Sequence, residues 1–260
     1  MSKNREQQSD RKIFVKWLII VILAFLGGMI GGFFGEEIAA YVLSFLEIFK
    51  GNAEIIAWIT LGVFIALNIV VYTICFAKYL KARRMADTWT SDDEVLDEVE
   101  EMLNHAMVPG NIMIGCNYFL YPFTMYVCDI DGDPDIKLII IAFVGILVFI
   151  AAMVCSVVLQ SKVISLEKEL NPEKRGNIFD KHFMKDWEES CDEAQKWIMY
   201  KAAYRAYRAA GNVCSVLWCV SVITMISFGT GILPVFCVSA IWITLNATYS
   251  VVSAKLESNK

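Results

Sequence analysis

Residues 138–161 read LIIIAFVGILVFIAAMVCSVVLQS and contain no charged side chain. An α-helix rises about 1.5 Å per residue and the hydrocarbon core of a bilayer is about 30 Å thick, so about 20 apolar residues can cross it. This stretch of 24 residues therefore predicts a transmembrane helix. We expect the helix to continue beyond the membrane until Asn171-Pro172, because proline cannot continue a helix.

Comparable stretches recur along the chain of 260 residues, of which 57% are hydrophobic and only 20% are charged. Residues 209–254 are uncharged over twice the length that one crossing needs, and Gly229, Gly231 and Pro234 divide them in two. No stretch shows the alternating polarity of a strand in a membrane barrel. The sequence predicts an all-α polytopic membrane protein, a single domain of six transmembrane helices in three hairpins, at residues 14–35, 55–77, 108–128, 138–160, 211–228 and 232–253.

The basic residues predict how these helices are oriented. If both termini face the cytoplasm, residues 78–107 and 162–210 form cytoplasmic loops that carry amphipathic helices. All but two of the 23 Lys and Arg residues then lie on the cytoplasmic side, and only Lys50 and Lys137 lie outside. This is the distribution that the positive-inside rule describes. We therefore expect a multi-pass protein of the plasma membrane with cytoplasmic N- and C-termini.

Small residues mark the first predicted span as a helix-packing element. Glycines four residues apart form a flat stripe on a helix, and a second helix can approach that stripe closely. The packing partner is a helix of the same chain, a second copy or another membrane subunit. The glycines concerned are Gly27, Gly28, Gly31, Gly32 and Gly35.

Residues 175–197, RGNIFDKHFMKDWEESCDEAQKW, lie in the second predicted cytoplasmic loop. At 100° per residue the apolar side chains fall on one side and the charged ones on the other, which predicts one amphipathic helix from about Asn177. Its apolar stripe packs on the acidic helix 95–103 or on the lipid surface, or it contacts a soluble partner. This candidate interaction surface comprises Phe179, Phe183, Trp187, Cys191, Trp197 and Ile198.

No pattern predicts a catalytic residue, a cofactor or a metal site. Cys191 and His182 lie nine residues apart, on opposite faces of the predicted helix, where they cannot form a catalytic dyad. Apart from Lys16 at the start of the first, the predicted spans hold no Asp, Glu, Lys, Arg or His, which disfavours an ion-coupled pump. Their polar side chains, among them Asn68 and Asn117, are expected to form hydrogen bonds between helices. We therefore expect a protein that is not an enzyme, and no basic cluster suggests nucleic acid.

Four carboxylates alternate in the outer loop between the third and fourth predicted spans. Alternating carboxylates can bind Ca²⁺, but the glycine here comes fourth in the loop and a proline follows, unlike an EF-hand. A tight solvated turn is favoured, and ion binding remains open. The residues are Asp129, Asp131, Asp133 and Asp135.

Three short motifs in the second cytoplasmic loop resemble a known family. They are the turn Pro172-Glu173-Lys174-Arg175-Gly176, the pair Asp186-Trp187 and the run Ser190-Cys191-Asp192-Glu193-Ala194. Together they resemble domain-of-unknown-function family 3169, uncharacterised integral membrane proteins of Gram-positive bacteria. The resemblance implies a bacterial plasma-membrane protein with a six-helix fold, and it implies no activity.

Two functions are compatible with this pattern. The first is a non-enzymatic accessory or regulatory subunit that acts through its cytoplasmic helices. The alternative is the permease subunit of an ATP-driven exporter that pairs with a separate ATPase, because the chain has no nucleotide-binding motif of its own. Expected partners are the lipid bilayer and a cytoplasmic or membrane protein, or a second copy of the chain.

Overall fold

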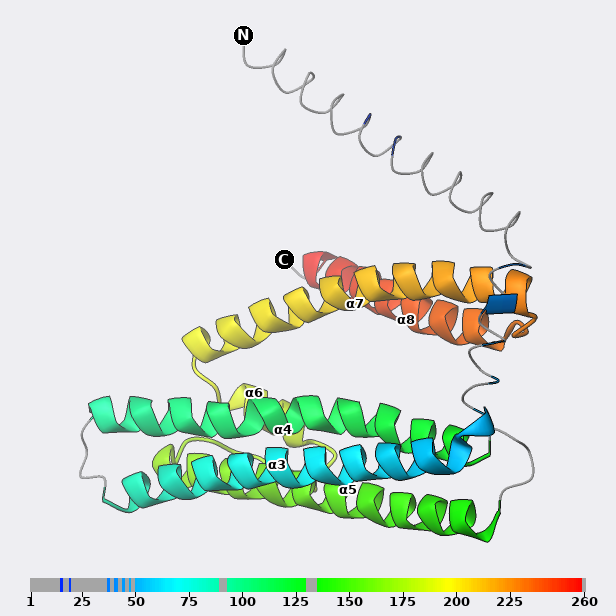
Figure 1. Ribbon diagram of the computed structural model, residues 1–260. Helices are drawn as coiled ribbons and strands as arrows, with labels where there is room; N and C mark the ends of the chain where they lie inside the picture. Colours follow the sequence, from blue (N-terminus) through cyan, green and yellow to red (C-terminus); the bar gives the residue numbers. More distant parts are fainter. Residues whose placement is uncertain are drawn as a thin grey trace. The chain divides into compact units, whose positions relative to one another are not determined.

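The computed structural model describes residues 51–88, 93–129 and 135–258, together with eight single residues between 15 and 50. Within this part of the chain all regular structure is helical, which confirms the all-α class. The helices are α3 (Ala53–Asp87), α4 (Asp93–Cys128), α5 (Ile136–Leu170), α6 (Phe183–Glu189), α7 (Glu193–Phe228) and α8 (Leu233–Ser258) (Figure 1).

The chain divides into two compact units, one of residues 47–196 and one of residues 1–46 with 197–260. In the first unit α3, α4 and α5 form a three-helix bundle, in which α4 runs antiparallel to both α3 and α5 (Figure 1). In the second unit α7 and α8 form a helical hairpin whose turn contains Gly229 and Gly231, both with positive φ. The prediction of a single membrane domain stays a prediction.

Four of the described helices, α3, α5, α7 and α8, are long and apolar enough to cross a membrane. They contain the predicted spans 55–77, 138–160, 211–228 and 232–253. The predicted span 108–128 lies in α4, which is not one of the four because Asn, Tyr and two prolines dilute its apolar residues. The predicted span 14–35, with all five of its glycines, lies outside the described residues. The count of six spans therefore stays a prediction.

The core of the bundle consists of apolar side chains that are buried where its three helices pack against one another. At one end of the bundle Tyr79, Val99 and Leu166 belong to one buried apolar cluster, drawn from α3, α4 and α5 respectively. Val99 lies on the acidic first part of α4, so the apolar face of that segment packs on its own bundle. Gly110 permits the close approach of α4 to α5, because a Cβ there would lie 3.0 Å from Leu159 Cδ2.

Polar side chains link the bundle helices within their apolar stretches. The Asn68 and Asn117 amides exchange two hydrogen bonds, with Nδ2–Oδ1 distances of 2.9 and 3.0 Å, and both residues are buried. Tyr72 of α3 is hydrogen-bonded to Ser156 of α5, whose Oγ donates to the Ala152 carbonyl at 3.0 Å. These pairs confirm the expectation that Asn68 and Asn117 form interhelical hydrogen bonds, and they fix the register of the three helices.

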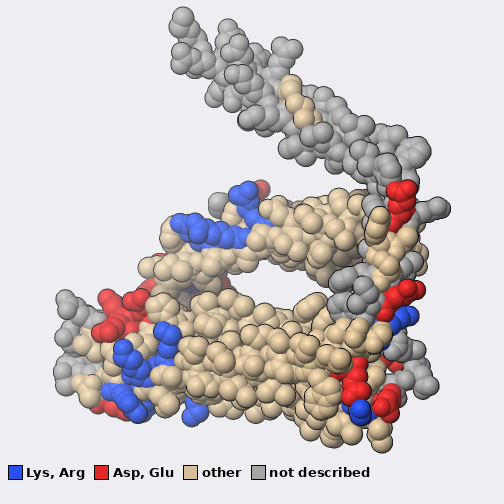
Figure 2. All heavy atoms as spheres, viewed as in Figure 1, with Lys and Arg blue, Asp and Glu red and all other residues tan. Residues whose placement is uncertain are grey.

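Charged residues gather at the end of the bundle where α3 ends, α4 begins and α5 ends (Figure 2). The opposite end carries few charges, among them the exposed pair Lys137–Glu54 at 2.9 Å. The uncharged middle of the bundle is broad and covered with exposed Ile, Val, Leu and Phe side chains. In a protein of this composition such a belt is the surface that lipid covers.

Candidate functional site

The candidate site is the connector, residues 171–192, which follows α5 and leads into α7. Helix α5 ends at Leu170, as expected from Asn171-Pro172, and the Glu167 carbonyl accepts the Asn171 N–H at 2.9 Å. The Asn171 side chain donates to Glu100 Oε1 of α4 at 3.0 Å. The start of the connector is therefore fixed to two helices of the bundle.

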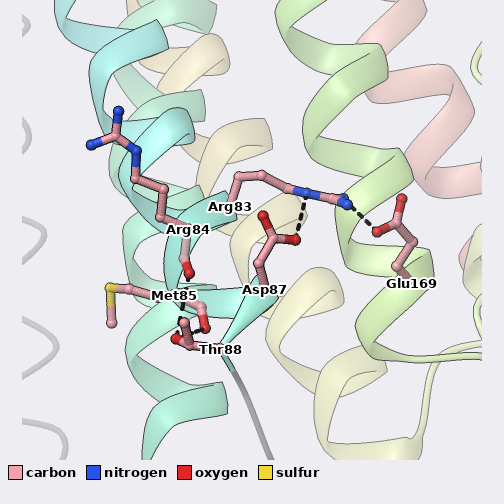
Figure 3. A network of polar contacts seen from close by, with 6 residues as sticks. All are labelled: Arg83, Arg84, Met85, Asp87, Thr88 and Glu169. Atoms are coloured by element: carbon pink, nitrogen blue, oxygen red, sulfur yellow. Dashed lines mark hydrogen bonds and ion pairs between the residues drawn. The ribbon is translucent and has the colours of Figure 1, made fainter.

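A second set of polar contacts closes the same end of the bundle (Figure 3). Arg83 of α3 forms an ion pair with Asp87 at 3.1 Å and a second one with Glu169 of α5. The hydrogen bond that Arg83 donates to Glu169, together with the negative charge of Glu169, raises the pKa of the Arg83 guanidinium above its ordinary value. Arg83 thus joins the C-terminal ends of α3 and α5, close to the residue at which the connector begins.

The turn Pro172–Gly176 can be formed only with glycine at its last position. Gly176 has φ +112°, and a Cβ at this position would lie 2.9 Å from Cδ2 of Phe183. Its carbonyl accepts a hydrogen bond from Lys168 Nζ at 2.9 Å. The first residues of the connector therefore fold back over the end of α5 and lie against the start of α6.

The Lys174 side chain lies at the centre of the connector and is only 6% exposed. Its Nζ lies 3.1 Å from Cys191 Sγ, donates to Gln195 Oε1, and is 5.2 Å from the centre of the Trp187 ring. A buried ammonium is tolerated only where such partners replace water. Lys174 therefore joins the Pro172–Gly176 turn to the segment that begins α7.

The same lysine affects the carboxylate of Glu167, which lies beyond the predicted span 138–160. Burial raises the pKa of Glu167 above its usual value, the positive charge of Lys174 offsets part of that rise, and the charge of Glu100 adds to it. The end of α5 is therefore an electrostatically coupled cluster rather than a row of independent surface charges.

The start of α7 is fixed by a reciprocal capping pair. The Gln195 N–H donates to Asp192 Oδ1 at 2.7 Å, and the Asp192 N–H donates to Gln195 Oε1 at 3.4 Å. This is the geometry of a capping box, which satisfies N–H groups that a helix start leaves without partners. Because Gln195 also accepts from Lys174, the cap and the turn are one hydrogen-bonded unit.

The prediction of one amphipathic helix through residues 175–197 was wrong. Residues 177–182 are turns, α6 is only Phe183–Glu189, and the chain turns again before Glu193. Side chains that bond the backbone cause both breaks, because they offer it partners other than those of a helix. Asp180 Oδ1 accepts the His182 N–H at 2.9 Å, and Ser190 Oγ donates to the Trp187 carbonyl at 2.8 Å while accepting the Arg175 N–H at 3.0 Å.

The predicted apolar stripe is consequently divided. Phe183 and Trp187 are half-buried and in ring contact, with centroids 5.7 Å apart, and Cys191 is buried beside Lys174. Phe179 is 73% exposed, and Met184, five residues later, is 69% exposed. The remaining two members, Trp197 and Ile198, are exposed on α7 and belong to the other compact unit.

His182 and Cys191, the two residues considered as a catalytic dyad, lie apart. His182 is exposed and its Nδ1 is 3.2 Å from Asp180 Oδ1, whereas Cys191 contacts Lys174. The His182 N–H hydrogen bond lowers the pKa of Asp180. Within the described ranges no three His, Cys, Asp or Glu residues are grouped so that they could hold a metal ion. Asp135 accepts the Ile136 N–H at 2.6 Å as the cap of α5, while Asp131 and Asp133 lie outside the described residues.

Sequence reasoning did not single out Lys174 as a central residue. A lysine in a polar turn is typical of a solvated surface, and its burial depends on contacts with residues 13 to 21 positions later. The available signal was its place in the Pro172–Gly176 motif, together with the Asp192-x-x-Gln195 pattern of a helix start. The structure brings these two motifs into direct contact.

The comparisons with known proteins agree with the motifs that meet in the connector. No curated protein and no solved structure matches the chain. One family model, described as a protein of unknown function (DUF3169), matches residues 14–252. This match covers both compact units and confirms the family that the connector motifs indicate, so the chain belongs to the DUF3169 family.

Proposed function

We propose that this chain is a non-enzymatic accessory or regulatory subunit of the bacterial plasma membrane, acting through its cytoplasmic segments. In this arrangement both termini, the charged end of the bundle and the connector face the cytoplasm. The concentration of Lys and Arg at that end of the bundle supports the orientation, because cytoplasmic loops are enriched in these residues. The membrane is crossed six times, with α4 shielded from lipid in part by α3 and α5.

One observation carries the proposal, and it concerns the outer surface of the connector. The connector is held in place by buried side-chain contacts around Lys174, yet it leaves Phe179 and Met184 largely exposed. Large apolar side chains on a rigid support are the usual anchors of protein interfaces, since little conformational entropy is lost on binding. We define Phe179 and Met184 as the docking face.

The chemistry of the docking face indicates a soluble protein partner. In the sequence Phe179 and Met184 alternate with the charged residues Lys181, Lys185 and Asp186. Exposed methionine and phenylalanine next to charges of both signs fit an apolar pocket with a mixed polar edge on the partner. We assign no chemical step to the connector, whose Cys191 thiol and Lys174 ammonium contact each other in its interior.

The test is recovery of partners from native membranes in mild detergent, followed by mass spectrometry. We expect Phe179→Ser/Met184→Ser to lose the partner while the chain is inserted normally. The matched control is Trp197→Ser/Ile198→Ser, which removes two exposed apolar side chains that do not belong to the docking face. Substitutions at Phe183 or Trp187 are unsuitable, because these rings are part of the connector's own packing.

The outcomes distinguish the functions. Recovery of a regulator or kinase that depends on the docking face supports the accessory role, and recovery of an ATPase supports a permease subunit instead. Equal recovery with the wild type and the docking-face variant contradicts the proposed surface. Orientation is tested separately with a membrane-impermeant thiol reagent: labelling of Phe179→Cys from outside intact cells would contradict the cytoplasmic placement.

A further inference from the structure

The α7–α8 hairpin contains a groove that the proposed accessory role does not use. It has a volume of about 540 Å³ and is lined along α7 by Tyr200, Tyr204 and Tyr207 and along α8 by Tyr249. The three α7 tyrosines are spaced by four and three residues, which places them on one face of the helix. All four belong to the same compact unit, so the groove is a feature of the hairpin alone.

Three of these rings form a stacked cluster. The ring centroids of Tyr207 and Tyr249 are 4.7 Å apart, and each lies 6.4 Å from Tyr204. The Tyr207 hydroxyl donates to Asn246 Oδ1 at 3.1 Å. The hydroxyls of Tyr204 and Tyr249 have no hydrogen-bond partner among the residues that the structure describes. They are therefore two donors beside an apolar groove.

The polarity of the groove changes along its length. Tyr200 and Leu256, the lining residues farthest from the turn of the hairpin, lie outside the apolar stretches of α7 and α8, whereas Thr244 and Leu245 lie within the apolar stretch of α8. One end of the groove thus lies at the depth of lipid headgroups and the other at the depth of acyl chains. Tyrosine is favoured at this boundary because its ring is apolar and its hydroxyl is polar.

The headgroup end of the hairpin is positively charged (Figure 2). Lys201, Arg205 and Arg208 follow the tyrosines by one residue each, so they form an adjacent stripe on α7. Between residues 197 and 258 the hairpin has four cations, the fourth being Lys255, against one carboxylate, Glu257. Lys201 lies 4.1 Å above the Trp197 ring, but Arg205 and Arg208 have no ion-pair partner within the described residues. An anionic group would complement this charge.

We propose that the groove binds one anionic phospholipid. Its phosphate lies near Arg205, Arg208 and the free tyrosine hydroxyls, and an acyl chain follows the groove past Leu245. The groove and the adjacent stripe of α7 supply both parts that such a ligand needs: the stripe carries the cations, and the groove has hydroxyl donors and a largely apolar lining. A bound lipid would also cover hairpin side chains that the chain itself leaves exposed.

The experiment uses the full chain, purified in neutral detergent and freed of lipid, with phosphatidylglycerol added and its binding measured by native mass spectrometry. We expect one phosphatidylglycerol to bind with clear preference over phosphatidylcholine. Arg205→Gln/Arg208→Gln should raise the Kd roughly 20-fold, since each cation near the surface contributes a factor of about five. The matched control Lys81→Gln/Arg84→Gln removes the same charge from α3 and should leave the Kd unchanged.

A second variant pair keeps the test independent of folding. Tyr204→Phe/Tyr249→Phe retains the rings and removes only the hydroxyls, so we expect weaker phosphatidylglycerol binding with an unchanged unfolding temperature. Three results would overturn the proposal: no bound lipid in the wild type, equal binding of phosphatidylcholine, or an equal loss with the α3 control. An unchanged Kd in both hairpin variants would show that the lipid binds elsewhere, and would equally overturn it.

Discussion

The α3–α5 bundle and the α7–α8 hairpin both consist of long helices rich in apolar residues, yet they are stabilised in different ways. Helices α3 and α5 each bury nine residues, whereas α7 buries only Cys214 and Ser221 and α8 buries none. The bundle also has interhelical hydrogen bonds and a folded connector at its charged end. Its structure is therefore determined by its own side chains, while the stability of the hairpin depends on what surrounds it.

The largest expected effect comes from a side chain at Gly176. Gly176→Ala should destabilise the bundle unit by about 3 kcal/mol, because it adds backbone strain to a steric clash with Phe183. Gly231→Ala in the hairpin turn is the matched control, since Gly231 also has positive φ but a Cβ there meets nothing within 4 Å. Thermal unfolding of the full chain in detergent measures both. Equal losses would show that the connector is not tightly packed.

The next effect concerns the ammonium group at the centre of the connector. Lys174→Met should cost about 2 kcal/mol, because it removes the donor to Cys191 and Gln195 while keeping most of the side-chain volume. Lys181→Met, on the exposed part of the connector, should change stability by less than about 0.5 kcal/mol. Hydrogen exchange of residues 172–195 should increase in the first variant alone. Unchanged exchange would mean that Lys174 is not needed to hold the turn.

The bundle was more predictable from sequence than the connector, for a physical reason. Length and hydropathy determine whether a segment can cross a membrane, so the spans 55–77 and 138–160 fall within α3 and α5. A buried Asn in an apolar helix needs a partner, and the Asn68–Asn117 pair followed from that requirement. Both predictions rest on local properties of the sequence, and contacts between distant residues do not change their outcome.

The connector depends instead on contacts between residues that are distant in sequence. The periodicity of residues 175–197 favours one helix, but Asp180, Ser190 and Asp192 bond the backbone and divide it. The burial of Lys174 follows from its distant partners and has no signature in its own neighbourhood. Only the motifs that resemble the family pointed to the connector. They did not show which contacts hold the connector together.

A smaller effect is expected from the buried Asn68–Asn117 amide pair. It tests whether this pair stabilises the bundle more than an exposed hydrogen bond stabilises the hairpin. Asn117→Leu should cost about 1 kcal/mol, because it leaves the Asn68 amide with one of its three hydrogen bonds inside an apolar bundle. The double variant with Asn68→Leu should recover part of this loss, which a double-mutant cycle measures. Asn246→Leu in the hairpin removes an exposed bond to Tyr207 and should cost less. A hairpin loss as large as that of the bundle would contradict the comparison.

The smallest effect is a pH dependence at the charged end of the bundle. Burial raises the pKa of Glu167, so the Glu167 carboxyl group binds its proton more tightly in the folded chain than in the unfolded chain. Between the usual value of 4.5 and the raised value, stability therefore falls as pH rises, and at neutral pH the full cost of an ionised buried carboxylate is present.

Glu167→Gln should consequently unfold at a higher temperature than the wild type at pH 7, and the difference should shrink as the pH approaches 4.5. Lys174 and Glu100 face this carboxylate with opposite signs, so the variant must be compared at fixed ionic strength. Asp180 acts in the reverse direction below its usual 3.8, outside this window. Glu257→Gln, at the exposed end of the hairpin, is the matched control and should change the unfolding temperature little at either pH. A less stable Glu167→Gln variant at pH 7 would mean that Lys174 stabilises the ionised carboxylate by more than burial costs.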